Sequence, residues 1–155
     1  MSETTLARLH ALGIQLPKAA IPAANYVSFA QTGSLIFTAG QLPLKDGKLI
    51  STGLLGAELD VTAGQEAAKQ CAINILSQLE AATGDLERIV RIVKLTIFVA
   101  STPEFTSQHL VGNGASDFLV AALGEKGKHA RSAVGVPCLP LNAPVEIEAI
   151  VEVSP

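Results

Sequence analysis

The 155-residue sequence predicts a single domain of the α+β class. Segments with strand-like patterns outnumber helical ones, and the two kinds do not alternate strictly, which disfavours a doubly wound sheet. Hydrophobic residues make up 48% of the chain, enough to build a core. Charged residues make up only 16%, against roughly 25% in an average globular domain, so we expect part of the surface to be a buried subunit interface.

The chain is predicted to open with a short amphipathic helix within residues 3–13. Leu6, Leu9 and Leu12 recur at intervals of three, and Gly13 can end the helix. Two prolines then break the helical pattern before the first strand.

Two β-hairpins are predicted next. Residues 26–29 and 34–38 have strand-like composition, and the Thr-Gly pair at 32–33 supplies the turn between them. The Asp-Gly pair at 46–47 is a strong signal for a second tight turn.

A long helix is predicted from Val61 to about Thr83, because small and apolar residues return every three to four positions. Gly84 supplies its stop. Cys71 falls on the apolar face of this helix, where a small buried thiol is the simplest interpretation. The residues that share this face are Ala68, Cys71, Ala72, Ile75, Leu79 and Ala82.

The C-terminal half returns to mixed strand and helix patterns. Its β-branched, increasingly apolar run after Arg88 predicts a central strand. The predicted elements are a strand over 88–99, a helical turn from Pro103, a helix over 115–123, a strand over 131–136, a loop over 137–144 and a strand over 145–153.

Composition and motifs exclude several function classes. The net charge of −3 argues against binding to nucleic acid or an anionic membrane, which requires a basic excess. The N-terminus lacks the pattern of a signal peptide and no apolar run could span a bilayer, so we expect a cytoplasmic protein. The three histidines and two cysteines lack ligand spacing, and no phosphate-binding glycine loop is found, so no metal or nucleotide site is predicted.

A few residues remain as candidates for chemistry. Arg131 opens a strand after a Gly/Lys-rich loop, where its guanidinium could bind a carboxylate or form an ordinary ion pair. Glu146 and Glu148 share one face of the last strand. If that face is covered, one carboxylate must be paired or have a raised pKa, which suits proton transfer; the alternative is a solvated outer face. Tyr26, the one tyrosine, has a structural hydroxyl as its default interpretation.

These residues lie in segments that resemble the YjgF/RidA family of reactive intermediate deaminases. The segment RSAVGVPCLP from Arg131 and the segment VEIEAIV from Val145 look like the C-terminal signature of that family. FTAGQLP from Phe37 and VKLTIFV from Val93 resemble its early and central strands, and Tyr26 precedes them. The resemblance runs from about residue 20 to the end. An additional helix and proline-containing segment occupy residues 1–20 and, with residues 113–117, resemble a longer branch that carries an endoribonuclease label.

The resemblance implies a chorismate-mutase-like fold, in which a mixed sheet packs against two main helices within one domain over residues 1–155. It also implies a homotrimer with three ligand clefts between subunits. The activity that it implies is hydrolysis of small imine or enamine acids, such as 2-aminoacrylate and 2-iminopropanoate, to 2-oxo acids and ammonia. No cofactor or metal is implied, and no nucleic-acid or membrane partner.

The resemblance also carries roles to individual positions. Arg131 would hold the substrate carboxylate, Glu146 would position or activate the attacking water, and Tyr26 would line the cleft. The backbone at Ala133 would offer hydrogen bonds to the substrate. The other implied substrate-binding residues are Ala39, Gly40, Asn113 and Ser116.

Three of these positions depart from the family pattern. Ala39 and Ala133 stand where many members have Ser and Cys, and Ser116 stands where an aromatic residue is common. These replacements predict a smaller and more apolar pocket.

Three functions therefore compete: an imine deaminase, a non-catalytic regulator that binds a carboxylate or oxo acid, and an endoribonuclease. Turnover that depends on Glu146 separates the first from the second, because both use Arg131. A ribonuclease fits the net charge and the six aromatic residues poorly, and its binding would weaken steeply with salt.

Overall fold

The computed structural model describes residues 3–155; Met1 and Ser2, which belong to the predicted domain, lie outside the described residues. Helices and strands follow one another in the order that the sequence suggests, with short 3₁₀ turns between some of them. The helices are α1 (Thr5–Ala11), α2 (Val61–Thr83) and α3 (Gln108–Leu123). The strands are β1 (Phe29–Thr32), β2 (Leu35–Thr38), β3 (Leu44–Lys45), β4 (Lys48–Leu49), β5 (Ile89–Ala100), β6 (Ala130–Val136) and β7 (Val145–Val153).

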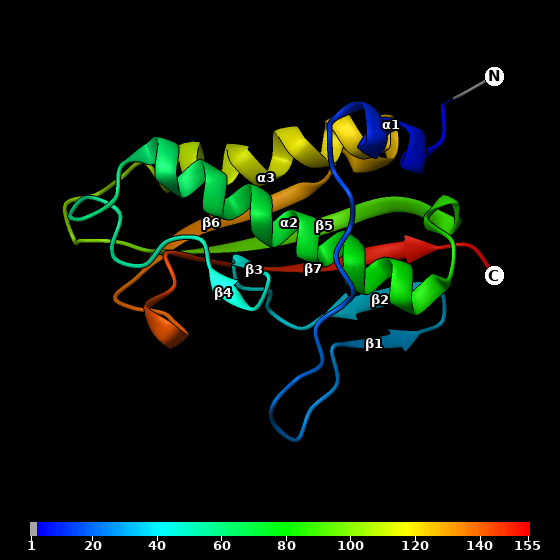
Figure 1. The fold of residues 1–155 in the computed structure, drawn as a ribbon, viewed down its shortest axis with the longest axis horizontal. Helices are drawn as coiled ribbons and strands as arrows, with labels where there is room; N and C mark the ends of the chain where they lie inside the picture. The colour runs from blue at the N-terminus through cyan, green and yellow to red at the C-terminus, as the bar shows by residue number, and fades with distance from the viewer. Residues whose placement is uncertain (1–2) are drawn as a thin grey trace.

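Five strands form one mixed sheet in the order β1-β2-β7-β5-β6, and β3 and β4 form a separate hairpin. Strands β5 and β6 run parallel, whereas the other neighbours in the sheet are antiparallel. Helices α2 and α3 lie on the same face of the sheet, as Figure 1 shows. The predicted α+β fold with two main helices is confirmed.

Helix α2 has the predicted limits because its end signals are local. The Asp60 side chain accepts a hydrogen bond from the Ala63 amide at the N-terminus, and Gly84 takes a left-handed conformation at the C-terminus. Cys71 is fully buried, as predicted.

Helix α3 begins at Gln108, so the predicted start at Ala115 is wrong. Glycines at 112 and 114 weaken the helical pattern of the sequence, but here they allow close packing. A Cβ on Gly114 would lie 2.1 Å from the Gln65 carbonyl oxygen of α2, so only glycine permits this approach. The predicted helical turn at Pro103 is also absent, because the chain forms only a hydrogen-bonded turn there.

The first strand starts at Phe29, so the strand predicted over residues 26–29 is wrong for most of its length. Pairing between β1 and β2 begins with Phe29 opposite Thr38, and the last contact beyond it joins the Ala39 amide to the Ser28 carbonyl. Tyr26 lies past the end of this ladder in an exposed loop, with 59% of its surface accessible. The predicted helix near the N-terminus is shorter than expected, at seven residues.

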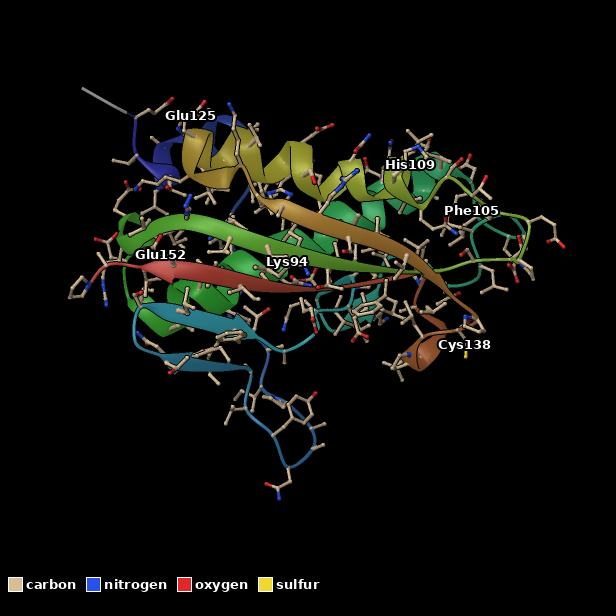
Figure 2. The ribbon with its side chains drawn as sticks, turned by 180° about the vertical axis from the view of Figure 1, so that it is seen from behind. Lys94, Phe105, His109, Glu125, Cys138 and Glu152 are labelled. Atoms are coloured by element: carbon tan, nitrogen blue, oxygen red, sulfur yellow. The ribbon has the colours of Figure 1, made fainter. Side chains whose placement is uncertain are left out.

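The two faces of the sheet differ sharply in their cover. Leu95, Ile97 and Ile147 point toward the helices and are fully buried. The opposite face, seen in Figure 2, carries no helix, and Phe37 and Val134 remain 41% and 43% exposed on it. None of the described helices is long and apolar enough to cross a membrane.

Candidate functional site

Arg131 lies at the edge of the sheet, and its guanidinium group is fixed by helix α3. Its Nη1 donates a hydrogen bond to Ser116 Oγ at 2.9 Å. Its Nη2 donates to the His109 carbonyl at 2.9 Å and to Asn113 Oδ1 at 3.0 Å. A guanidinium carries five N–H groups, so these three bonds fix its plane and leave N–H groups that can bind an anion.

Ser116 also contacts His129, which completes what we call the Arg131 cluster: Arg131, Asn113, Ser116 and His129. Ser116 Oγ lies 2.9 Å from His129 Nε2, and His129 Nδ1 lies 2.6 Å from the Gly127 carbonyl oxygen. Burial lowers the pKa of His129, and the charge of Arg131 lowers it further. The histidine is therefore neutral at neutral pH.

The local fold explains why the guanidinium can lie so close to the helix. Residue 112, on the helix face that meets β6, is glycine. A Cβ there would lie 3.1 Å from Arg131 Nη1 and 3.0 Å from Ile97 Cδ1. Ala133 follows Arg131 by two positions on the same face of β6 and packs against the core.

Glu146 belongs to a second group, which we call the Glu146 cluster: Glu146, Gly40 and the chain neighbour of Gly40, Ala39. A Cβ on Gly40 would lie 2.7 Å from Glu146 Oε2, so the carboxylate rests directly on the glycine backbone. Burial raises the pKa of Glu146, and the neighbouring charge of Glu148 raises it further. Such a carboxylate is a better proton acceptor than a solvated one.

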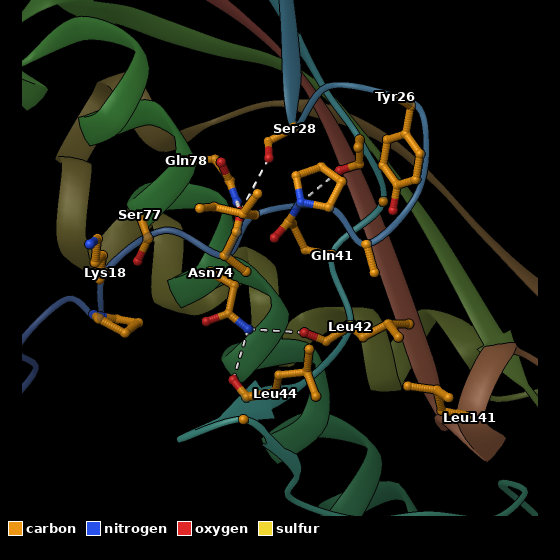
Figure 3. A pocket seen from close by; sticks show the side chains of 18 of the residues that line it. Lys18, Tyr26, Ser28, Gln41, Leu42, Leu44, Asn74, Ser77, Gln78 and Leu141 are labelled. Atoms are coloured by element: carbon orange, nitrogen blue, oxygen red, sulfur yellow. Dashed lines mark hydrogen bonds between the residues drawn. The ribbon is translucent and has the colours of Figure 1, made fainter.

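A cavity of about 540 Å³ adjoins the Glu146 cluster, between the N-terminal segment, α2 and the turn after β2. Tyr26, Ala39 and Gly40 line it together with the side chain of Leu141. Figure 3 shows Asn74 of α2 among the side chains that line it, and the side-chain amide of Asn74 donates to the carbonyls of Leu42 and Leu44. These two bonds fix the turn that carries Gly40.

The two clusters face opposite sides of the sheet. Arg131 bonds to α3 and thus lies on the helix-covered face. Val145 and Ile147 are fully buried beneath the helices, so the alternation of strand β7 turns Glu146 to the uncovered face. One subunit therefore does not bring Arg131 and Glu146 together.

Of the predicted site residues, Arg131, Asn113 and Ser116 form one group with Ala133 beside them. Glu146 contacts Gly40, whereas Tyr26 lines the cavity with Ala39 and Gly40 and is not placed against Glu146.

Sequence reasoning missed His129. It lies just before strand β6, two residues before Arg131, but nothing local indicated the serine on α3. Within residues 3–155 no three His, Cys, Asp or Glu side chains gather in a way that could hold a metal ion.

A mixed sheet with two helices on one face defines a small α+β fold, and comparison with known proteins gives its family. The sequence profile described as "YjgF/chorismate mutase-like, putative endoribonuclease" matches residues 6–153. The chain therefore belongs to the YjgF/chorismate mutase-like family. The resemblance predicted from sequence motifs is confirmed.

Individual relatives agree with this assignment. Protein TCP17 of Trypanosoma cruzi is 52% identical over 149 residues, which cover 96% of this chain and 93% of that protein. The crystal structure of Atu1372 from Agrobacterium tumefaciens, a protein of unknown function, has 53% identity and a TM-score of 0.92, and covers 97% of this chain and 92% of that one.

A more distant structure carries a functional name. RidA from an Antarctic Psychrobacter species is 29% identical, with a TM-score of 0.63, and the match covers 90% of this chain and 98% of that one.

Proposed function

We propose that this protein is a cytoplasmic deaminase that hydrolyses small imine and enamine acids of the 2-aminoacrylate and 2-iminopropanoate type to 2-oxo acids and ammonia. The observation that carries the proposal is the Arg131 guanidinium, held by three hydrogen bonds at a sheet edge with N–H groups left for a carboxylate. Its membership in a family that includes RidA supports the same activity.

The reaction requires little beyond orientation and a proton acceptor. An imino acid is already electrophilic at the imine carbon. Arg131 holds the substrate carboxylate, and Glu146 accepts a proton from the water that attacks that carbon. As the C–O bond forms, the imine nitrogen takes up a proton, which gives the carbinolamine. Glu146 then returns its proton to that nitrogen, the C–N bond breaks to release ammonia, and the hydroxyl loses its proton as the C=O bond forms. The balance is one imino acid and one water giving one 2-oxo acid and one ammonia.

The proposed active site lies between subunits, because Arg131 and Glu146 occupy opposite faces of the same sheet. The uncovered sheet face carries Phe37, Val134 and Ile150 beside charged residues such as Glu146 and Glu148, and in the proposed assembly a neighbouring copy covers it. In a closed homotrimer, each cleft would combine the Arg131 cluster of one subunit with the Glu146 cluster of the next.

The activity is tested by generating imino acids from several amino acids with an amino-acid oxidase and following release of the 2-oxo acid. We expect the wild type to accelerate release, and Arg131→Ala and Glu146→Gln each to abolish the acceleration. Acceleration that survives in Arg131→Ala contradicts the proposed role of this residue. No acceleration with any imino acid, together with retained binding of a 2-oxo acid, would leave the carboxylate-binding regulator as the function.

The composite site is tested by co-expressing the two inactive variants. A mixed trimer can contain a cleft whose Arg131 and Glu146 both come from unmutated positions. Random mixing gives such a cleft at about one quarter of the sites, so we expect about one quarter of the wild-type activity. Activity that stays at the level of the separate variants would show that the two residues do not act across a subunit boundary.

A further inference from the structure

A histidine that the proposed reaction does not use lies behind the Arg131 cluster. His129 is half-buried and connects two elements: its Nδ1 is 2.6 Å from the Gly127 carbonyl oxygen and its Nε2 is 2.9 Å from Ser116 Oγ on α3. Arg131 Nη1 is in turn 2.9 Å from the same Ser116 oxygen. The four residues form an unbroken hydrogen-bonded chain that ends at the proposed carboxylate-binding group.

The direction of every bond in this chain is fixed by its ends. A carbonyl oxygen only accepts, so His129 Nδ1 carries the proton that it donates to Gly127. In the neutral ring Nε2 is then the acceptor, and Ser116 donates its hydroxyl proton to it. The Ser116 oxygen is left with lone pairs for Arg131, which only donates.

We propose that His129 is a positioning residue for Arg131, which acts through Ser116 to hold the guanidinium in its carboxylate-binding orientation. The proposal rests on the proposed function, in which Arg131 binds the carboxylate of the substrate. It assigns a role to two side chains, an imidazole and a hydroxyl, that the hydrolysis itself does not require.

Without His129 the serine has another acceptor. A hydroxyl in a helix commonly donates to the carbonyl four residues earlier, which for Ser116 is that of Gly112, one turn earlier in α3. That rotation moves the hydroxyl proton and the lone pairs together and changes the angle at which Arg131 meets the oxygen. The imidazole is thus needed to choose one of two hydroxyl orientations.

The acceptor at the other end of the chain is rigid. Gly127 is buried, and a Cβ on it would lie 2.3 Å from the Leu119 carbonyl oxygen, so the backbone that carries the accepting carbonyl is pressed against α3. His129 therefore spans two points that are both fixed to the same helix. Because the ring stays neutral, it also adds no second positive charge beside Arg131.

Two amide variants separate the two hydrogen bonds of His129. In His129→Gln, the side-chain amide reaches the position of Nε2 and can still accept the Ser116 proton. In His129→Asn, the amide reaches only the position of Nδ1 and can still donate to Gly127. Pyruvate, the product expected from 2-iminopropanoate, is the carboxylate probe, and pyruvamide is the uncharged control.

We expect His129→Asn to weaken pyruvate binding about tenfold, with His129→Gln within about threefold of wild type and Ser116→Ala resembling His129→Asn. Pyruvamide binding should be the same in all four proteins, measured by calorimetry. Equal loss in the Gln and Asn variants, or equal loss for pyruvate and pyruvamide, would overturn the positioning role and indicate packing alone.

A second measurement does not depend on any ligand or activity. The chain has three histidines, and His10 and His109 are exposed, so the ¹⁵N resonances of His129 can be assigned from their loss in His129→Gln. We expect the pure Nδ1–H tautomer, with an Nε2 resonance that moves in Ser116→Ala. An Nε2–H tautomer or a mixture of tautomers would overturn the proposed hydrogen-bonded chain from Gly127 through His129 and Ser116 to Arg131. If neither pyruvate binding nor imine hydrolysis is found, the proposed function fails. The spectrum still decides whether His129 accepts the hydrogen bond from Ser116 as proposed.

Discussion

The Arg131 cluster and the Glu146 cluster hold their charged groups by opposite means. Arg131 is bound by three acceptors from α3, and one of these, Ser116, is itself bound by His129. Glu146 has no side-chain hydrogen-bond partner among residues 3–155 and is held by steric contact with Gly40. The Arg131 guanidinium is thus oriented before any ligand binds, whereas the Glu146 carboxylate has no hydrogen-bond donor beside it in the described chain.

This difference suits two different tasks. A carboxylate receptor must present its N–H groups in a fixed plane, which hydrogen bonds to a helix can provide. A proton acceptor must be basic, and partial burial beside Glu148 raises the pKa of Glu146. Stabilising hydrogen bonds to Glu146 would lower its basicity, so their absence within the described chain is useful to the proposed reaction.

The largest expected effect comes from breaking the hydrogen bonds of the Arg131 cluster. In Arg131→Lys the ammonium keeps the charge but cannot bond in one plane to Ser116, Asn113 and the substrate. We expect kcat/KM for imino-acid hydrolysis to fall about 100-fold or more. Arg91→Lys is the matched control, because Arg91 forms only an exposed ion pair with Glu152. Nearly unchanged kcat/KM in Arg131→Lys would show that charge alone is sufficient there.

The second-largest effect is expected from a methyl group added at Gly40, where Glu146 contacts the glycine backbone. In Gly40→Ala the new methyl group would lie 2.7 Å from Glu146 Oε2, so the carboxylate must move. We expect a fall in kcat/KM of between about 10- and 100-fold, since displacing a catalytic group by about 1 Å has effects of this size.

The control for Gly40→Ala is Gly33→Ala. A Cβ on Gly33 meets no atom within 4 Å, and its φ of +57° makes alanine strained there by about 1 kcal/mol. This variant reproduces a loss of stability without touching Glu146. Equal activity losses in the two variants would show that the close contact at Gly40 has no catalytic importance.

A smaller effect is expected at Gly112, the glycine that contacts Arg131 in the Arg131 cluster. In Gly112→Ala the methyl group would approach Arg131 Nη1 to 3.1 Å, a contact that a small side-chain shift relieves. We expect about a threefold rise in KM with little change in kcat. Alanine also favours the helix by up to about 1 kcal/mol, so the melting temperature should not fall much. A loss of activity as large as that of Gly40→Ala would contradict the proposed contrast between the Arg131 cluster and the Glu146 cluster.

The smallest change is a shift in pH dependence. Because the charge of Glu148 raises the pKa of Glu146, Glu148→Gln should lower that pKa. The proposed base is active when ionised, so the acid limb of the kcat/KM profile should move to lower pH. Glu152→Gln, on the same strand face but beyond Glu148, should leave the limb in place. A limb that stays fixed or moves to higher pH in Glu148→Gln would argue against Glu146 as the base.

The fold was predictable where its signals are local. Helix α2 has the predicted ends because Asp60 and Gly84 are capping residues that act on their own neighbours. The first half of α3 was not predictable, since Gly112 and Gly114 are poor helix formers. Their value depends on α2 and Arg131, which lie close only after folding.

The site was predictable in its residue types and not in its arrangement. Motif resemblance named Arg131, Glu146 and Asn113, and the structure places Arg131 against Asn113. His129 was missed because its partner Ser116 lies 13 positions earlier on another element. Local sequence patterns do not report such pairs.

The sequence by itself determined which residues alternate and which repeat with helical spacing, because these periods belong to the backbone geometry of each segment. It therefore placed Glu146 and Glu148 on one strand face. Only the tertiary structure decided that this face is the uncovered one and that Arg131 points the other way. The physical reason is that α2 and α3 bury whichever face carries Val145 and Ile147, and that choice depends on packing between distant segments.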